Sequence, residues 1–218
     1  MPQSSVKLAR SRRTASREER RRQLIKATMK CIAKRGIGST TLAHVAAEAG
    51  LSQGIVNLHF NSKENLLNET LRSLAEEYRQ QFYSTLEASG PGAADKLLAL
   101  MEMDLKPSVC DRQKLAVWFA FWGEVKAIPT YRKICNYNDQ AYDREVSQLC
   151  ETIIAEGPYA DVDPDTVTEA LASLTNGLWL SCLIAPRRWD RSVGMAAVQS
   201  YLQAVFPKHY KNKLRRTA

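Results

Sequence analysis

The chain has 218 residues, of which 44% are apolar and 25% charged, an ordinary composition for a soluble globular protein with one large core or two small domains. The first 23 residues are polar and basic, and the best apolar run, residues 178–186, is far shorter than the ~20 residues that cross a bilayer, so we expect no signal peptide and no membrane partner. The five cysteines are odd in number and far apart, which favours free thiols in a reducing cytoplasm over a zinc site.

The charge is unevenly distributed along the chain. The formal net charge is +8, but residues 1–35 contain twelve Lys and Arg against two Glu, a net +10, so the remaining residues carry −2. A basic N-terminal segment followed by a chain of slightly negative net charge indicates a local polyanion-binding site, with nucleic acid as the first candidate. A basic segment that only improves solubility is the alternative, and charge alone does not decide between them.

Residues 1–16 are rich in Ser and Arg and have no apolar periodicity, so we expect a disordered basic arm. From Arg17 onward, apolar residues recur at helical spacing as far as Gly36, which is a natural C-terminal stop. This pattern predicts a first helix that ends where two glycines make a turn.

Two short helices follow, at about 42–49 and 52–59, and Ala-Gly-Leu-Ser joins them. Gly50 permits the left-handed conformation of the turn, and Leu51 fills the angle between the two helices. This spacing predicts a helix-turn-helix. An ordinary helical hairpin inside a helical core is the alternative.

The remainder of the chain has no sustained period-two pattern, and Pro and Gly divide it into helical segments. Asn61 followed by Glu64 resembles a capping box at the start of a long helix that reaches Ala88. The later helices are expected at 93–105, 111–127, 130–156, 165–185 and 190–205. The sequence therefore predicts an all-α protein with about nine helices.

The stretch TTLAHVAAEAGLSQGIVNLHFNSKENLL, residues 40–67, resembles the DNA-binding signature of the TetR family of bacterial regulators. The residues that match this signature are Thr41, Val45, Ala46, Ala49, Gly50, Ser52, Gly54, His59, Phe60, Lys63 and Leu66. Leu51 replaces the usual Val, and Asn57 stands where most members have Tyr.

Two later sequence motifs resemble those of a narrower group, the BetI regulators of the choline to glycine-betaine pathway. These motifs are AVWFAFW at residues 116–122 and NGLWL at residues 176–180. BetI regulators also lack Tyr at the position of Asn57, whereas Asn176 stands where an Asp is expected. The resemblance covers about residues 17–205. It implies a helix-turn-helix domain at 17–62 and a helical ligand-binding and dimerisation domain at 63–207, with the arm 1–16 and a basic tail 208–218 outside.

A helix-turn-helix places the first residues of its second helix in the major groove of DNA. Gln53 projects from the first turn and can pair with adenine, while Gly54 lets the backbone come close to the DNA. Ile55 could touch a thymine methyl group, and Asn57 and Leu58 follow on the exposed side. For each of these residues a solvated surface position is the alternative.

Phosphate contacts are expected where hydroxyls, backbone amides and the helix dipole converge, at Thr40 and Thr41 before the preceding helix. The resemblance implies two further phosphate contacts, His59 and Lys63. One helix-turn-helix covers a single half-site of the DNA, so useful affinity for double-stranded operator DNA implies a two-fold homodimer. The resemblance places the dimer contacts on the helices at 165–185 and 190–205. Whether the arm touches DNA stays open.

Residues 114–124, KLAVWFAFWGE, concentrate aromatic side chains. Trp118, Phe119 and Trp122 share one helix face and Phe121 points elsewhere. Core packing is the usual role of such a stripe, but tryptophan faces also bind quaternary ammonium groups. The resemblance implies choline or a related compound as the ligand, with Asn176 and Trp179 completing the candidate pocket. Further candidates are Tyr131, Tyr137 and Tyr142, with Glu124 or Asp139 as a source of charge.

We therefore expect a cytoplasmic, homodimeric repressor of glycine-betaine synthesis genes whose operator affinity a choline-like compound modulates. One alternative is a regulator of the same type that responds to a different hydrophobic or cationic effector; another is a DNA-binding protein with no small-molecule effector. An enzyme is not expected, and neither is a cofactor or a metal. The three histidines lie in the predicted helix-turn-helix domain or the tail. The sequence contains no nucleophile elbow, P-loop or metal-ligand spacing.

Overall fold

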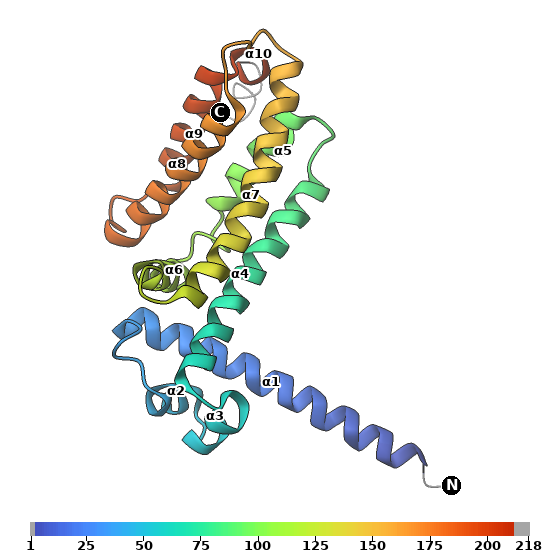
Figure 1. Ribbon diagram of the computed structural model, residues 1–218, viewed down its shortest axis with the longest axis vertical. Coiled ribbons are helices and arrows are strands. Elements are labelled where there is room, and N and C mark those ends of the chain that lie inside the picture. The colour runs from blue at the N-terminus through green and yellow to red at the C-terminus, as the bar shows by residue number, and fades with distance from the viewer. Residues whose placement is uncertain (1–2, 212–218) are drawn as a thin grey trace. The chain divides into compact units, whose positions relative to one another are not determined.

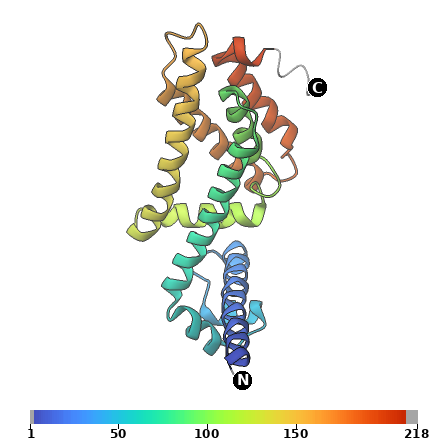
Figure 2. The same cartoon turned by 90° about the vertical axis from the view of Figure 1, so that its right-hand side faces the viewer.

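The computed structural model describes residues 3–211, except for the side chains of residues 3–16 and 137–139. It contains ten helices and no strand within residues 3–211 (Figures 1 and 2), so the predicted all-α class is confirmed. The helices are α1 (Gln3–Arg35), α2 (Leu42–Ala49), α3 (Gln53–Phe60), α4 (Lys63–Ala88), α5 (Ala93–Asp104), α6 (Arg112–Glu124), α7 (Pro129–Ala155), α8 (Pro164–Ile184), α9 (Arg191–Val205) and α10 (Pro207–Tyr210).

The helix positions agree with the sequence except at the two ends of the chain. Residues 3–16, where the sequence predicted a disordered arm, form the first part of α1. This segment has no Gly or Pro to interrupt a helix, and its Leu, Ala, Lys and Arg have high helix propensity. At the other end, α10 is an additional helix that overlaps the predicted basic tail; residues 212–218 of that tail lie outside the described part.

The contacts within the chain define two compact units, and the boundary between them falls inside α4. The first unit contains the chain up to Leu74 together with Ala116–Tyr131. The second unit contains Ala75–Leu115 and the chain from Arg132 onward. The sequence predicted the change from the DNA-binding domain to the C-terminal domain at residue 62, where the motif changes, because the partners of a long helix are not visible in a sequence.

The first unit has its own apolar core, which four helices build together. Its fully buried members are Leu24, Ala27, Cys31, Val45, Ala46, Val56, Phe60 and Leu66. Leu51, in the turn between α2 and α3, packs against this core as the sequence predicted. Since α2 and α3 have only eight residues each, tertiary packing of this kind has to hold them in place.

The turn between α2 and α3 has the conformation that its sequence predicts. Gly50 ends α2 with φ of 64°, in the left-handed region, and the Leu51 N–H donates to the Ala46 carbonyl at 2.9 Å. The predicted capping box at Asn61 is wrong. Asn61 instead ends α3 with φ of 60°, and the hydroxyl oxygen of Ser62 accepts the Asn65 N–H at 3.1 Å to begin α4.

In the second unit, the C-terminal helices close the core. The buried Tyr210 of α10 donates its hydroxyl proton to the Ala94 carbonyl at 2.9 Å, and Phe206 packs edge-on against Tyr159 with ring centroids 5.2 Å apart. By length and composition alone α8 could cross a membrane, but core helices of soluble proteins meet the same criterion. In this structure α8 buries Leu171 and Trp179 inside the second unit.

Candidate functional sites

The α3 helix presents one face to the core of the first unit and the other face to solvent. Val56 and Phe60 are buried, whereas Gln53 and Asn57 are exposed. Leu58 has 74% of its side chain exposed, although it is a large apolar residue. The Leu58 side chain is therefore available for contact with an external surface.

Gly54 lies on the same exposed face of α3. A methyl group added at this position would meet only the Ser52 hydroxyl oxygen, at 3.8 Å. No internal contact therefore requires a glycine here, and its backbone is open to close approach from outside. Ile55, which the sequence also places at the DNA, is only half-buried.

The α2 N-terminus separates the two threonines that the sequence predicts as phosphate contacts. Thr41 is exposed and caps α2, because its hydroxyl oxygen accepts the His44 N–H at 3.2 Å. Thr40 is buried, and its hydroxyl donates to the Gly36 carbonyl at 2.8 Å. Lys63 reaches the same turn, where its ammonium donates to the Gly38 carbonyl at 3.1 Å. Thr41 and Lys63 thus fit the predicted role, while the Thr40 side chain stabilises the turn.

His59 is half-buried at the end of α3, and its Nδ1 has no hydrogen-bond partner among the described residues. Burial lowers the pKa of His59, and the positive charges of Arg17, Arg21 and Arg20 lower it further. The imidazole is therefore neutral near pH 7 in the protein without DNA.

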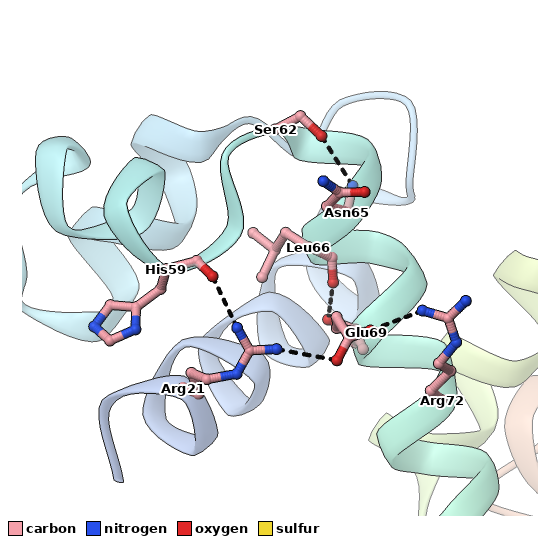
Figure 3. A network of polar contacts seen from close by, with 8 residues as sticks. Arg21, His59, Ser62, Asn65, Leu66, Glu69 and Arg72 are labelled. Atoms are coloured by element: carbon pink, nitrogen blue, oxygen red, sulfur yellow. Dashed lines mark hydrogen bonds and ion pairs between the residues drawn. The ribbon is translucent and has the colours of Figure 1, made fainter. Parts of the chain in front are cut away.

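Arg21 of α1 connects α3 to α4 (Figure 3). Its guanidinium donates to the His59 carbonyl at 2.8 Å and to the Glu69 carboxylate at 3.0 Å, and it lies 4.6 Å from the centre of the Phe60 ring. Arg72 holds the other Glu69 oxygen at 2.7 Å. We call these contacts the Arg21 clamp. Sequence reasoning missed the clamp, since no short-range pattern pairs residue 21 with residue 69.

Part of the positive charge at the N-terminal end is already neutralised within the first unit. Lys30 and Lys34 of α1 both pair with Glu48 of α2, at 3.3 and 3.2 Å, and Arg21 pairs with Glu69. Exposed pairs of this kind contribute little to stability. The two carboxylates, Glu48 and Glu69, nevertheless offset part of the positive charge of α1, so the net charge of residues 1–35 overstates the electrostatic footprint.

The aromatic residues of α6 separate into two groups. Trp122 lies 5.8 Å from Trp118 and 5.0 Å from Phe119, measured between ring centroids. Phe121 is fully buried and packs edge-on against Tyr131 at 4.8 Å, so it points away from the others as predicted. All of these residues belong to the first unit.

The other two predicted ligand residues, Asn176 and Trp179, belong to α8 in the second unit. Asn176 is exposed and Trp179 is buried, although the two positions are three residues apart and therefore adjacent on the helix surface. Three of the five predicted ligand residues thus belong to the first unit and two to the second, and a pocket that all five share stays a prediction. The side chains of Tyr137 and Asp139 are outside the described part of the chain.

Trp179 instead takes part in a cluster around the carboxyl group of Asp104, at the end of α5. Asp104 is fully buried, and its Oδ1 accepts the Tyr78 hydroxyl at 2.8 Å. Its backbone carbonyl accepts the Trp179 indole N–H, also at 2.8 Å. The second carboxyl oxygen, Oδ2, has no hydrogen-bond partner among the described residues.

Burial raises the pKa of Asp104 to about 7, although contacts with the hydroxyls of Tyr78 and Thr175 partly oppose the rise. Leu97, Leu100 and Met101 are buried on the same helix, one to two turns before Asp104. Asp104 thus continues the helical spacing of the buried residues of α5. This position of an acidic residue on an apolar helix face could have been recognised in the sequence.

Tyr142 of α7 contributes a second buried polar atom without a partner, its hydroxyl oxygen. Its ring lies 5.8 Å from Phe82, and Tyr78 packs edge-on against Trp179 at 5.9 Å. Burial raises the pKa of Tyr142 well above its usual value, and the charge of Asp104 adds to this effect. We call the set of Tyr78, Phe82, Asp104, Tyr142, Thr175 and Trp179 the Asp104 cluster. Its carboxyl group and aromatic rings have the chemistry to hold a cation.

The raised pKa of Asp104 makes stability depend on pH. Between the ordinary value of 3.8 and the folded value of about 7, the folded protein binds a proton that the unfolded chain has lost, so stability falls as pH rises through this window. We expect Asp104→Asn to remove this decrease, which amounts to roughly 4 kcal/mol at most above pH 7. Urea unfolding at pH 5 and pH 8 should show roughly 2–3 kcal/mol of this decrease, because these two pH values cover about two-thirds of the window. Glu102→Gln, which removes a half-buried charge from the same helix, should keep the wild-type slope; an unchanged slope in Asp104→Asn would contradict the assignment.

Comparison with known proteins identifies the family. Residues 24–70 match the bacterial regulatory proteins of the tetR family, and residues 93–207 match the C-terminal domain of BetI-type transcriptional repressors. The HTH-type transcriptional regulator BetI of Paraburkholderia xenovorans is 30% identical over 189 residues, 87% of this chain and 94% of the relative. The BetI of Burkholderia thailandensis is 30% identical over 186 residues, with coverage of 85% and 93%.

Solved structures agree with this relationship. A transcriptional regulator from Pseudomonas aeruginosa PAO1 has a TM-score of 0.78 and 25% identity, and the match covers 89% of this chain and 93% of that one. A regulator from Saccharomonospora viridis, solved in complex with choline, has a TM-score of 0.76 and 24% identity, with coverage of 85% and 96%. The chain is a DNA-binding transcriptional regulator and not an enzyme, and it belongs to the TetR family with a C-terminal domain of the BetI type.

Proposed function

We propose that this regulator is a cytoplasmic repressor of glycine-betaine synthesis genes, that it binds operator DNA as a homodimer, and that choline or a related quaternary ammonium compound modulates its affinity for the operator. The observation that carries the proposal is the exposed face of α3, where Gln53, Gly54, Asn57 and Leu58 are available to a major groove and make no contribution to the core.

The homodimer is supported by an apolar surface on the two helices that the sequence selected for pairing. Ile184 of α8 and Val193 of α9 are 69% and 65% exposed, and Leu180 of α8 is 41% exposed. Large apolar residues that are exposed on neighbouring helices indicate a protein interface. A second copy of the chain is the partner that a two-fold operator requires.

Choline as the effector is supported by two independent observations. The regulator from Saccharomonospora viridis, which has the same fold, was solved with choline, and the curated relatives carry the BetI name. Within this chain, the Asp104 cluster brings an acidic group and aromatic rings together in the second unit. A quaternary ammonium group cannot donate a hydrogen bond and is held by charge and by aromatic faces, which suits such a site.

Helix α4 offers a route from the effector to the DNA, because both units share it. The helix carries Glu69 of the Arg21 clamp in the first unit and Tyr78 of the Asp104 cluster in the second. An effector that favours one position of α4 would thereby bias the position of α3. Operator affinity changes only to the extent that the effector binds the two states unequally.

The test is operator binding measured by fluorescence anisotropy with the intergenic DNA upstream of the protein's own gene. We expect binding that weakens steeply between about 50 and 200 mM salt, since phosphates are neutralised by Lys and Arg. Choline chloride should change the affinity more than an equal concentration of sodium chloride, which controls for ionic strength. Tight binding that choline leaves unaltered would discard choline and favour the alternative, a different hydrophobic or cationic effector.

Substitution of Gly54 by Ala separates DNA contact from folding. The added methyl group has room in the free protein, so the stability should stay the same or rise by up to about 1 kcal/mol, as for other helix glycines. Operator affinity should fall at least about tenfold, because the methyl group would keep the DNA backbone or bases at a distance. Gly123→Ala on α6 is the matched control, since that position is also open, and it should leave operator affinity unaltered.

Substitution of Ile184 by Glu tests the dimer surface. A carboxylate in an apolar interface has to be desolvated, so the dissociation constant of the dimer should rise at least about tenfold. Analytical ultracentrifugation over a concentration series measures it. Leu58→Glu, at an equally exposed apolar residue of α3, should keep the dimer while losing operator binding. A dimer of unaltered strength in Ile184→Glu would place the interface elsewhere.

A further inference from the structure

The Asp104 cluster contains two buried polar atoms without partners among the described residues, Oδ2 of Asp104 and the hydroxyl oxygen of Tyr142. A buried polar atom that is left unpaired costs about 1–3 kcal/mol, and a charged one costs more. Native proteins leave few such atoms, and each one calls for an explanation. Two of them in one cluster, on helices from different parts of the second unit, indicate a partner that binds both.

The chemistry of that partner follows from the surroundings of Asp104. The side chains that stabilise its charged form are the neutral hydroxyls of Tyr78 and Thr175, and no Lys, Arg or His among the described residues is close enough to lower its pKa. The carboxylate therefore lacks a counter-ion from the described protein. Tyr78 binds its Oδ1 and Trp179 binds its backbone carbonyl, so two aromatic residues lie next to Asp104, and aromatic faces attract a cation that brings no hydrogen-bond donors of its own.

The Tyr142 hydroxyl defines a second point of contact. A tyrosine phenol is protonated at neutral pH, and burial of Tyr142 raises its pKa further, so its hydroxyl can donate a hydrogen bond. A ligand oxygen two carbons from the cationic nitrogen, as in choline or betaine aldehyde, would accept it. The Tyr142 ring lies 5.8 Å from Phe82, one turn of α4 from the Tyr78 whose hydroxyl binds Asp104, so both polar groups contact the same stretch of α4.

We infer that Asp104 is the counter-ion of a small quaternary ammonium effector in the second unit and that the Tyr142 hydroxyl binds the effector's oxygen. This assignment rests on the proposed function, and it adds two specificity-determining residues. It also moves the centre of the site from the aromatic run of α6, which the sequence emphasised, to single residues on α4, α5, α7 and α8.

The experiment is isothermal titration calorimetry of the full-length protein with three probes. Choline carries both the charge and the hydroxyl, tetramethylammonium carries only the charge, and 3,3-dimethylbutan-1-ol is the neutral isostere of choline. The wild-type protein should bind choline at least about tenfold more tightly than the neutral isostere, as expected for a charge-assisted contact. This comparison needs no variant, so it does not depend on how a variant folds.

The variants separate the two contacts. Asp104→Asn should lose at least about tenfold in choline affinity and should no longer distinguish choline from its neutral isostere. Tyr142→Phe should weaken choline by about three- to tenfold while leaving tetramethylammonium unaltered, because only choline carries the oxygen. Glu102→Gln, which removes a charge from the same helix outside the cluster, is the matched control and should bind all probes as the wild type does.

The outcomes distinguish this inference from the proposed function. Equal affinity of the wild type for choline and its neutral isostere, or an undiminished preference for choline in Asp104→Asn, would overturn the role of Asp104 while leaving a choline-responsive regulator possible. Choline binding through Asp104 with no change in operator affinity would uphold the inference and reject choline as the modulator. Absence of binding by choline and by tetramethylammonium would overturn both.

Discussion

The orientation of α3 is the constraint on which DNA recognition depends. A helix of eight residues is too short to be stable alone, so its direction has to come from contacts with its neighbours. The inner face of α3 is held by the apolar core that α1, α2 and α4 complete, and its C-terminal carbonyl is held by the Arg21 clamp. The side chains that would read bases make neither kind of contact. The residues that hold α3 in place and the residues proposed to contact DNA therefore lie on opposite sides of the same short helix.

The core of the second unit differs from that of the first because it contains a carboxyl group. The hydrogen bonds of the fold offset only part of the free-energy cost of burying this group. Burial shifts the pKa of Asp104 to about 7 and leaves Oδ2 without a partner among the described residues. A cationic ligand would relieve this cost, so part of its binding free energy would come from an unfavourable feature of the empty protein. A regulator needs such a difference between its states, since a ligand that binds both states equally shifts nothing.

Local patterns predicted most of the fold. Helical periodicity and the Pro and Gly breaks located α2 to α9 to within a few residues, and Gly50 and Leu51 have the predicted conformation and packing. The sequence also placed Gln53, Asn57 and Leu58 on the exposed side of α3, where the structure has them. The error at the start of α4 was local too: Asn61 and Ser62 are both good capping residues, and only the backbone decides between them.

The residues that the sequence could not bring together are those that meet through long-range contacts. Arg21 and Glu69, or Asp104 and Trp179, are far apart in the chain and are individually unremarkable. The aromatic run of α6 attracted attention because its members are adjacent, yet adjacency on one helix says nothing about which partners complete a site. At Thr40 the hydroxyl donates to the Gly36 carbonyl, an internal contact that the motif position did not predict, and a phosphate contact there stays a prediction.

The Arg21 clamp also has a consequence for how operator preference can evolve. The clamp binds α3 through a backbone carbonyl, which every amino acid possesses, and through Phe60 on the inner face. Substitutions at Gln53, Asn57 or Leu58 therefore leave the anchoring contacts intact and carry little penalty in folding. A duplicated copy of such a gene can explore new DNA sequences while remaining folded, so divergence of the binding specificity need not wait for compensating changes in the scaffold.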